Sequence, residues 1–156
     1  LAPGADRLES FVESPGFMSL QGLGLVAGGS KLLVTAYGNG LFTIDLASRA
    51  IRALAPPPDA TLLGLDGLVA SGPDIIAVQN GVEPQRVVRV RLAPAADIVV
   101  GVDVLAAALP GFDDLTLITL VAGRPHVVSQ SGWAGFANPR ATLPPHSVQV
   151  MTVGTD

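Results

Sequence analysis

The sequence predicts an all-β protein made of about three four-stranded β-propeller blades, which is half of a six-bladed ring. The first observation is a repeat: "LQGLGLVAGGSKLLVTAYGNG" (20–40) and "LDGLVASGPDIIAVQNG" (65–81) share X-Gly-Leu, small residues, an apolar run and a turn ending in Gly. The second is strand-like alternation after each copy, and the third is the Gly- and Pro-rich links between units. A tandem unit of about 40–50 residues with four short strands is typical of a propeller blade. A β-sandwich with accidental internal similarity is the alternative.

The first two units follow the same order of strands. After each repeated segment comes an alternating strand, 41–46 and 86–92, and then a short outer strand, 50–54 and 101–105. The period-2 pattern predicts half-buried third strands, whereas the inner strands are nearly all apolar or small, which predicts burial on both faces. Asn39-Gly40 is the dipeptide of a tight hairpin whose two central residues need positive φ. "APPPDA" (55–60) and "LPGFDD" (109–114) link the units.

A third copy follows when "GRPHVVSQSG" (123–132) is set on "GPDIIAVQNG" (72–81) at an offset of 51. This alignment places Gln130 on Gln79, His126 on Ile75, and Leu117 on Asp66. The alternating segment 147–153 then supplies the third strand of this unit. The chain is therefore expected to form one partial propeller, 1–156, with blades at about 20–54, 65–105 and 116–153.

One strand-like segment, 7–13, has no blade of its own, and the third blade lacks a fourth strand. Two chains would therefore make a six-bladed ring, each supplying residues 7–13 to the other. The alternative is that the remainder of the ring lies outside this chain.

Composition excludes several partners. The chain is 49% hydrophobic and 14% charged with a net charge of −4, and it has no basic stripe, which argues against nucleic acid. The longest apolar region, 92–109, is interrupted by Asp97, Asp103 and Pro94, so a membrane span is not expected. The absence of Cys excludes disulfides and thiolate sites.

The segments 19–48, 65–92 and 112–133 resemble the SMP-30/gluconolactonase-like family of six-bladed propellers, in particular its C-terminal half. The resemblance is to secreted or uncharacterised bacterial members, which favours an extracytoplasmic location. It implies a divalent-metal site, Ca²⁺ or another cation, that family lactonases use to hydrolyse sugar lactones. Asp66 of Asp66-Gly67-Leu68 matches the family's Asp ligand, and Gln21 stands where the family has an Asn. The family's Glu ligand comes from a blade that this chain does not contain.

From the residues alone, Asp66 has two readings. Beside a hard cation, its carboxylate would be a ligand and a base for attacking water, the catalytic role. The alternative, which we favour, is a structural role in which the Asp66 carboxylate caps a turn.

The other candidates for ligand binding are weaker. Asn80 and Gln130 end second strands, Glu83 lies on a loop, and Trp133 and Phe136 offer aromatic faces; satisfied turns, solvation and packing are the competing readings. His126 and His146 have no metal-ligand spacing, so a structural role is expected. The sequence therefore favours a non-catalytic propeller module with a binding or scaffold role. A metal-dependent lactonase-like hydrolase, formed when the ring is completed, is the alternative.

Overall fold

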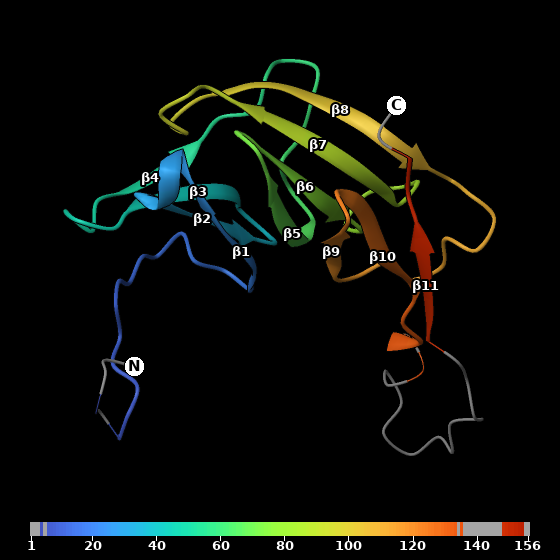
Figure 1. Cartoon of the computed structure of the whole chain (residues 1–156), viewed down its shortest axis with the longest axis horizontal. Coiled ribbons are helices and arrows are strands. Elements are labelled where there is room, and N and C mark those ends of the chain that lie inside the picture. Colours follow the sequence, from blue (N-terminus) through green and yellow to red (C-terminus); the bar gives the residue numbers. More distant parts are fainter. Residues whose placement is uncertain (1–3, 5, 134, 136–147, 155–156) are drawn as a thin grey trace.

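A computed structural model describes residues 4, 6–133, 135 and 148–154 and consists of antiparallel sheets that stand side by side along an arc (Figure 1). The first sheet contains β1 (Leu20–Val26), β2 (Lys31–Ala36), β3 (Gly40–Asp45) and β4 (Ile51–Leu54), with a 3₁₀ turn, η1 (Ala27–Gly29), after β1. The second contains β5 (Leu65–Ser71), β6 (Asp74–Gln79), β7 (Arg86–Leu92) and β8 (Val99–Ala107). The third contains β9 (Ile118–Val121), β10 (Arg124–Gln130) and β11 (Gln149–Thr152).

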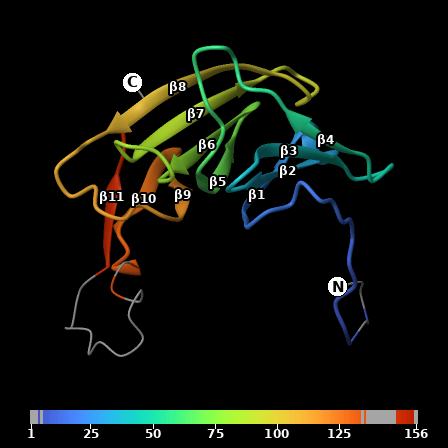
Figure 2. The same cartoon turned by 180° about the vertical axis from the view of Figure 1, so that it is seen from behind.

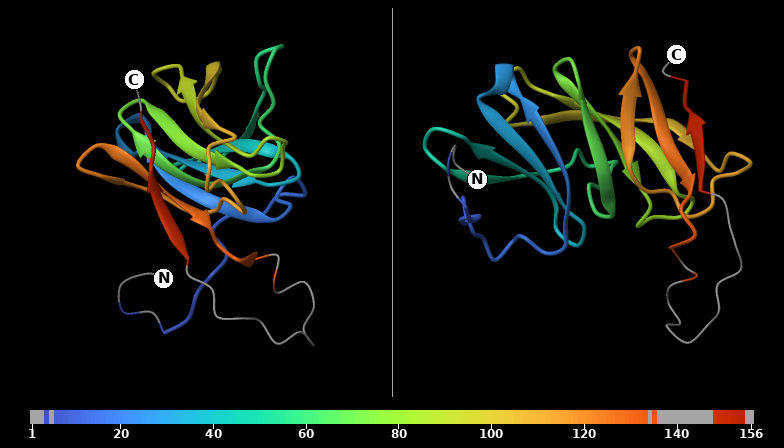
Figure 3. Two further views of the ribbon diagram at one scale, coloured as in Figure 1. Left: turned by 90° about the vertical axis from the view of Figure 1, so that its right-hand side faces the viewer. Right: turned by 60° about the horizontal axis from the view of Figure 1, so that its bottom comes forward.

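Within each sheet the strands pair in chain order, as the repeat predicts for propeller blades. Figure 2 shows the same fan from behind, and in Figure 3 (right) the three sheets stand next to one another. The inner strands β1, β5 and β9 are neighbours, with β5 in contact with both of the others. The prediction of an all-β chain of propeller blades is thus confirmed.

The second sheet is buried on both faces, which explains its apolar second strand. Ile75 and Ala77 of β6 pack into a core shared with Leu33 of the first sheet. Ile76 and Val78 point the other way, into a core shared with the third sheet. Because successive side chains of a strand point to opposite faces, only a continuous apolar run fills both interfaces.

The repeated X-Gly-Leu motif is explained by the close approach of neighbouring inner strands. A Cβ atom on Gly22 of β1 would lie 2.6 Å from the backbone nitrogen of Leu68 in β5. A Cβ on Gly67 of β5 would lie 2.9 Å from the Cα of Leu117, just before β9. Each glycine therefore lets one blade seat its inner strand against the backbone of the next.

The hairpins correct the alignment of the third copy. Ser71 pairs with Asp74 at the β5–β6 turn, and Val121 pairs with Arg124 at the β9–β10 turn. The two turns are separated by 50 residues rather than 51. The same spacing is seen in the backbone, because Gly64 and Asp114, which precede the inner strands, both have positive φ, 67° and 65°.

The corrected register changes which residues are equivalent. Thr116, not Leu117, takes the position of Asp66, and Gln130 takes that of Asn80 rather than Gln79. His126 corresponds to Ile76 instead of Ile75. The identity of two glutamines had favoured the wrong offset, whereas strand pairing fixes the correct one.

Two further expectations differ from the structure. Ala36 pairs with Gly40, so the β2–β3 turn has three residues, and of Asn39 and Gly40 only Gly40 has positive φ, 96°. The outer strand β8 runs to Ala107, beyond the predicted 101–105, because its end pairs with Arg86 of β7. Pairing overrides the helical propensity of the Ala-rich stretch.

Residues 7–13 carry no strand in the described chain and run away from the first sheet (Figure 1). Phe11 in this segment lies under the Arg49 guanidinium, 4.8 Å from ring centroid to Cζ. A strand is defined by its pairing partner, which would belong to a second chain. The expected outer strand therefore stays a prediction.

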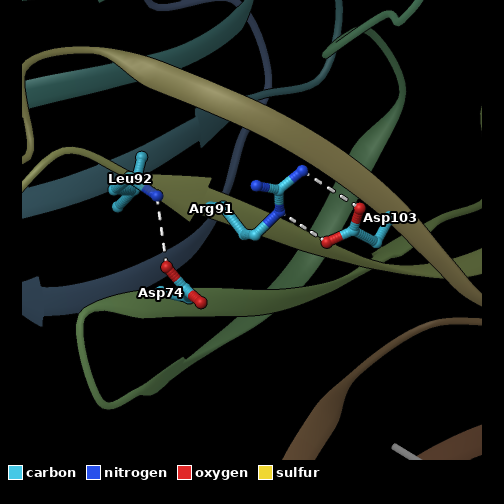
Figure 4. Close-up of polar contacts among 4 residues, drawn as sticks. All are labelled: Asp74, Arg91, Leu92 and Asp103. Carbon is cyan, nitrogen blue, oxygen red and sulfur yellow. Dashed lines mark hydrogen bonds and ion pairs between the residues drawn. The ribbon is translucent and has the colours of Figure 1, made fainter. Parts of the chain in front are cut away.

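Polar side chains link neighbouring strands of the second sheet (Figure 4). Arg91 of β7 donates to Asp103 of β8 at 2.7 and 3.3 Å, and Asp74 Oδ1 accepts from the Leu92 N–H at 3.2 Å. The Arg91–Asp103 pair is about half exposed, so solvent screens it.

No helix in the described part of the chain is long and apolar enough to cross a membrane.

Candidate functional site

A pocket of about 530 Å³ opens where the inner strands begin and the second strands end. The three blades all contribute to it. Gln21, Asp66 and Thr116, the equivalent residues of the three repeats, all line it. The remaining lining residues are Ser19, Tyr37, Asn80, Gln85, Asp114, Leu115, Leu117, Ser131 and Trp133.

Asp66 is held at the junction of the second and third sheets. Its Oδ2 accepts hydrogen bonds from Asn80 Nδ2 and from Thr116 Oγ1, each at 2.9 Å. Asn80 follows β6, and Thr116 precedes β9. One carboxylate thus ties the end of a second strand to the start of the next inner strand.

The amide of Asn80 is oriented by two acceptors. Its Nδ2 also donates to the Leu115 carbonyl at 2.6 Å. Its Oδ1 is buried and has no hydrogen-bond partner among the described residues. A buried acceptor of this kind normally receives a donor, from water or a ligand.

Thr35 connects the first sheet to the same place. Its side chain is fully buried, its Oγ1 accepts from the Gly22 N–H at 2.7 Å, and the hydroxyl donates to the Asp66 carbonyl at 2.9 Å. Thr35 therefore fixes the backbone of Asp66 from one side while Thr116 fixes its carboxylate from the other.

The pKa of Tyr37, which lines the pocket, is raised by its surroundings. Burial raises the pKa of its hydroxyl above the ordinary value of 10.0, and the negative charge of Asp66 raises it further. Its ring lies against Gly81, where a Cβ would be 3.0 Å from the phenolic oxygen. The pocket therefore favours a protonated phenol, a hydrogen-bond donor, near a carboxylate.

The third sheet adds a second acid. Asp114 Oδ2 accepts from Ser131 Oγ at 2.6 Å, and both residues line the pocket. Trp133, which is 73% exposed, also lines the pocket, at its rim.

The structure brings together four of the predicted site residues, Asp66, Gln21, Asn80 and Trp133. Glu83 and Gln130 do not line the pocket. Glu83 is exposed, and Gln130 of β10 pairs with Gln149 of β11. Phe136 and His146 lie outside the described residues.

His126, for which a structural role was expected, has structural contacts, and so does Gln79. Gln79 is fully buried, donating to two backbone carbonyls at 2.9 and 2.8 Å while accepting from Arg86 Nε at 2.8 Å. His126 Nδ1 lies 2.9 Å from the Arg124 carbonyl, and its Nε2 lies 3.0 Å from Thr152 Oγ1.

Sequence reasoning missed several pocket residues, notably Thr116, Asp114 and Gln85. The correct offset of 50 would have found Thr116, since it makes that residue the counterpart of Asp66. Gln85 gave no such signal; its Oε1 accepts from the Leu115 N–H at 2.7 Å.

The donor set fits a divalent cation only in part. Asp66 and the unsatisfied Oδ1 of Asn80 are oxygen ligands of the right kind, but Ca²⁺ takes six to eight. No group of three or more His, Cys, Asp or Glu residues that would hold a metal occurs in the described part of the chain. A complete site would need ligands from other blades.

Among known structures the similarity is to propeller enzymes, which agrees with the fold. The chain matches the PQQ-bound aldose sugar dehydrogenase (Adh) from Streptomyces coelicolor with 18% identity and a TM-score of 0.59, over 77% of this chain and 40% of that one. It matches the apo-form of the soluble aldose sugar dehydrogenase (Asd) from Escherichia coli with 16% identity and a TM-score of 0.54, over 73% of this chain and 38% of that one.

The aligned part therefore spans about two fifths of the length of these dehydrogenases, and such low identity establishes the β-propeller fold alone. No family model matches the chain, and no curated protein matches it.

Proposed function

We propose that this chain is a propeller ligand-binding module, non-catalytic by itself, whose pocket around Asp66 takes a neutral polyhydroxylated small molecule such as a sugar. The observation that carries the proposal is the buried, unsatisfied Oδ1 of Asn80 beside the Asp66 carboxylate. The Asp66 carboxylate lines the pocket as a fixed acceptor for ligand hydroxyl groups, and the Asn80 amide, whose buried Oδ1 lacks a donor among the described residues, lies beside it.

The rest of the lining has the same chemistry. Tyr37 supplies a hydroxyl kept protonated, Gln21 an amide, and Ser19 a short hydroxyl. The exposed indole of Trp133 at the rim gives an apolar face on which a sugar ring would stack. An uncharged ligand with many hydroxyls satisfies these groups without placing a second charge beside Asp66.

The cofactor of the Streptomyces neighbour is a poorer match. Pyrroloquinoline quinone is a polycarboxylate, which calls for Arg or Lys. The described pocket lining holds Asp66 and Asp114 and neither of those cations. This part of the propeller would repel such an anion rather than bind it.

The second candidate is a metal-dependent hydrolase of sugar lactones, similar to the SMP-30/gluconolactonase family, formed when the ring is completed. The pairing of Asp66 with a free Asn80 oxygen favours it, because both are ligands for Ca²⁺. The remaining ligands would have to come from other blades.

Calorimetric titration of the full chain with D-glucose tests the proposal. Millimolar affinity is expected, and Asp66→Asn should weaken it about tenfold by removing a charged acceptor. Asp59→Asn, a change of an exposed Asp outside the pocket lining, is the matched control.

Absence of heat with glucose and related polyols would contradict the proposal. Release of acid from D-glucono-1,5-lactone in the presence of CaCl₂ would support the hydrolase instead.

A further inference from the structure

The first sheet ends in an apolar face that the described chain leaves uncovered. Leu20, Leu23 and Leu25 of β1 are 48%, 60% and 57% exposed. Gly22 and Gly24, which alternate with them, face Leu68 of the second sheet. The three leucines therefore line the side of β1 that points away from the rest of the protein.

The same positions are covered in the next blade. Leu65 and Leu68 of β5, the counterparts of Leu20 and Leu23, are 0% and 7% exposed and belong to the core shared with the first sheet. Ala70, the counterpart of Leu25, packs against that core.

The third sheet repeats this arrangement. Leu115 takes the position of Leu65 and is fully buried in the core shared with the second sheet. Ile118 and Leu120 pack against the same core. Wherever a preceding blade is present, these three positions are its contact surface.

The opposite end of the chain offers a second uncovered face. On the third sheet, Leu117, Val121 and Val150 are 65%, 54% and 64% exposed. Ile118 and Leu120 alternate with the first two and face the second sheet. This outer surface occupies the place that Gly67 and Ile76 of the second sheet use to meet the third.

We propose that a second copy of this chain covers both faces, with the third sheet of each copy packed on the β1 leucines of the other. A head-to-tail contact of this kind must close into a ring or continue as a filament, and two copies closing a ring leave no apolar end face exposed. The aligned part covers 40% of the Streptomyces propeller, so two copies supply about twice that share.

The new interface differs from the internal ones at one point. Leu117 occupies the position that is Gly22 in the first sheet and Gly67 in the second. The partner's β1 therefore rests on the Leu117 side chain rather than on backbone, and stands farther from the third sheet than β5 stands from β1.

Light scattering of the full chain during size exclusion, over a range of concentrations, tests the proposal. The wild-type chain is expected to have about twice the 15.9 kDa mass of one copy. Leu23→Asp places a charge on the β1 face and should shift the mass to that of one copy. Leu25→Asp is a second variant on the same face, and circular dichroism checks that both fold.

Ile98→Asp is the matched control, because Ile98 is also an exposed apolar residue, at 56%, but lies in the turn before the outer strand β8. It should keep the mass of the wild type. A one-copy mass for the wild type at every concentration would overturn the proposal, and so would larger, heterogeneous species, since a closed ring has no free face. Equal behaviour of Leu23→Asp and Ile98→Asp would overturn it as well.

Discussion

The carboxylate of Asp66 organises the pocket at the residue scale. It accepts from Asn80 and Thr116, its backbone carbonyl accepts from Thr35, and its charge acts on Tyr37. Four segments of the chain therefore meet at one residue. The Asp66 carboxylate accepts from the side chains of Asn80 and Thr116, not from backbone N–H groups of a turn among the described residues, so the turn-capping reading does not describe its contacts. The side chain does line a pocket, and the catalytic reading stays a prediction.

Substitution Asp66→Asn should lower the pKa of Tyr37. Removing the negative charge eliminates one of its two causes, while burial remains, so the pKa should stay above 10.0 but move towards it. Tyr37 is the only tyrosine, so the ultraviolet absorbance of the phenolate during a pH titration reports it alone. Asp59→Asn should leave the titration unchanged; an equal shift in both variants would contradict the assigned cause.

The raised pKa of Tyr37 also sets a pH dependence of stability. The phenol is protonated in the folded chain at a pH where the unfolded chain has begun to ionise. The free energy of unfolding should therefore be independent of this group below pH 10.0 and fall as the pH rises through the raised pKa. Urea unfolding at a series of alkaline pH values measures it. In Tyr37→Phe the alkaline loss should be smaller, and an identical loss would count against this linkage.

At the scale of elements, glycine sets the distance between blades. Gly22→Ala should destabilise the protein by about 1–3 kcal/mol, since a Cβ would overlap the Leu68 backbone, which cannot move as a side chain would. Urea unfolding followed by circular dichroism gives the change. Gly154→Ala is the control, because its Cβ would meet nothing within 4 Å. Equal stability of the two variants would mean that β1 and β5 are not held as closely as described.

The sequence predicted the elements well because their causes are local. Both-face burial makes β6 a continuous apolar run, and the repeated Gly22 and Gly67 marked where strands meet. The register of the third copy was predicted wrongly because two matching glutamines outweighed a turn whose length only pairing reveals.

The candidate site was predicted in part for a related reason. Asp66 lies at the start of β5 and Asn80 directly after β6, and the repeat in the sequence marks both of these strand ends. Gln85 and Asp114 reach the pocket from loops. Glu83 lies on the same loop as Gln85 yet stays outside the lining. Which loop side chains converge depends on packing between blades, and no spacing in the sequence records it.

At the scale of the whole molecule, the response to Ca²⁺ separates the two candidate functions. A ligand that binds only the folded chain raises its melting temperature. Because the described residues supply only part of a calcium site, millimolar CaCl₂ should leave the melting temperature of the chain unchanged. Differential scanning calorimetry with and without chelator measures it. A rise that disappears in Asp66→Asn would contradict the binding-module account and favour the hydrolase.

The central claim is that the pocket around Asp66 binds a polyhydroxylated ligand, and the fluorescence of Trp133 tests it most directly. Trp133 is the only tryptophan and lines the rim of the pocket, so its emission reports this place alone. Titration of the full chain with D-glucose should shift or quench that emission in a saturable manner, and Asp66→Asn should weaken the response. An emission spectrum unchanged up to high sugar concentration, or a response equally strong in Asp66→Asn, would contradict the account.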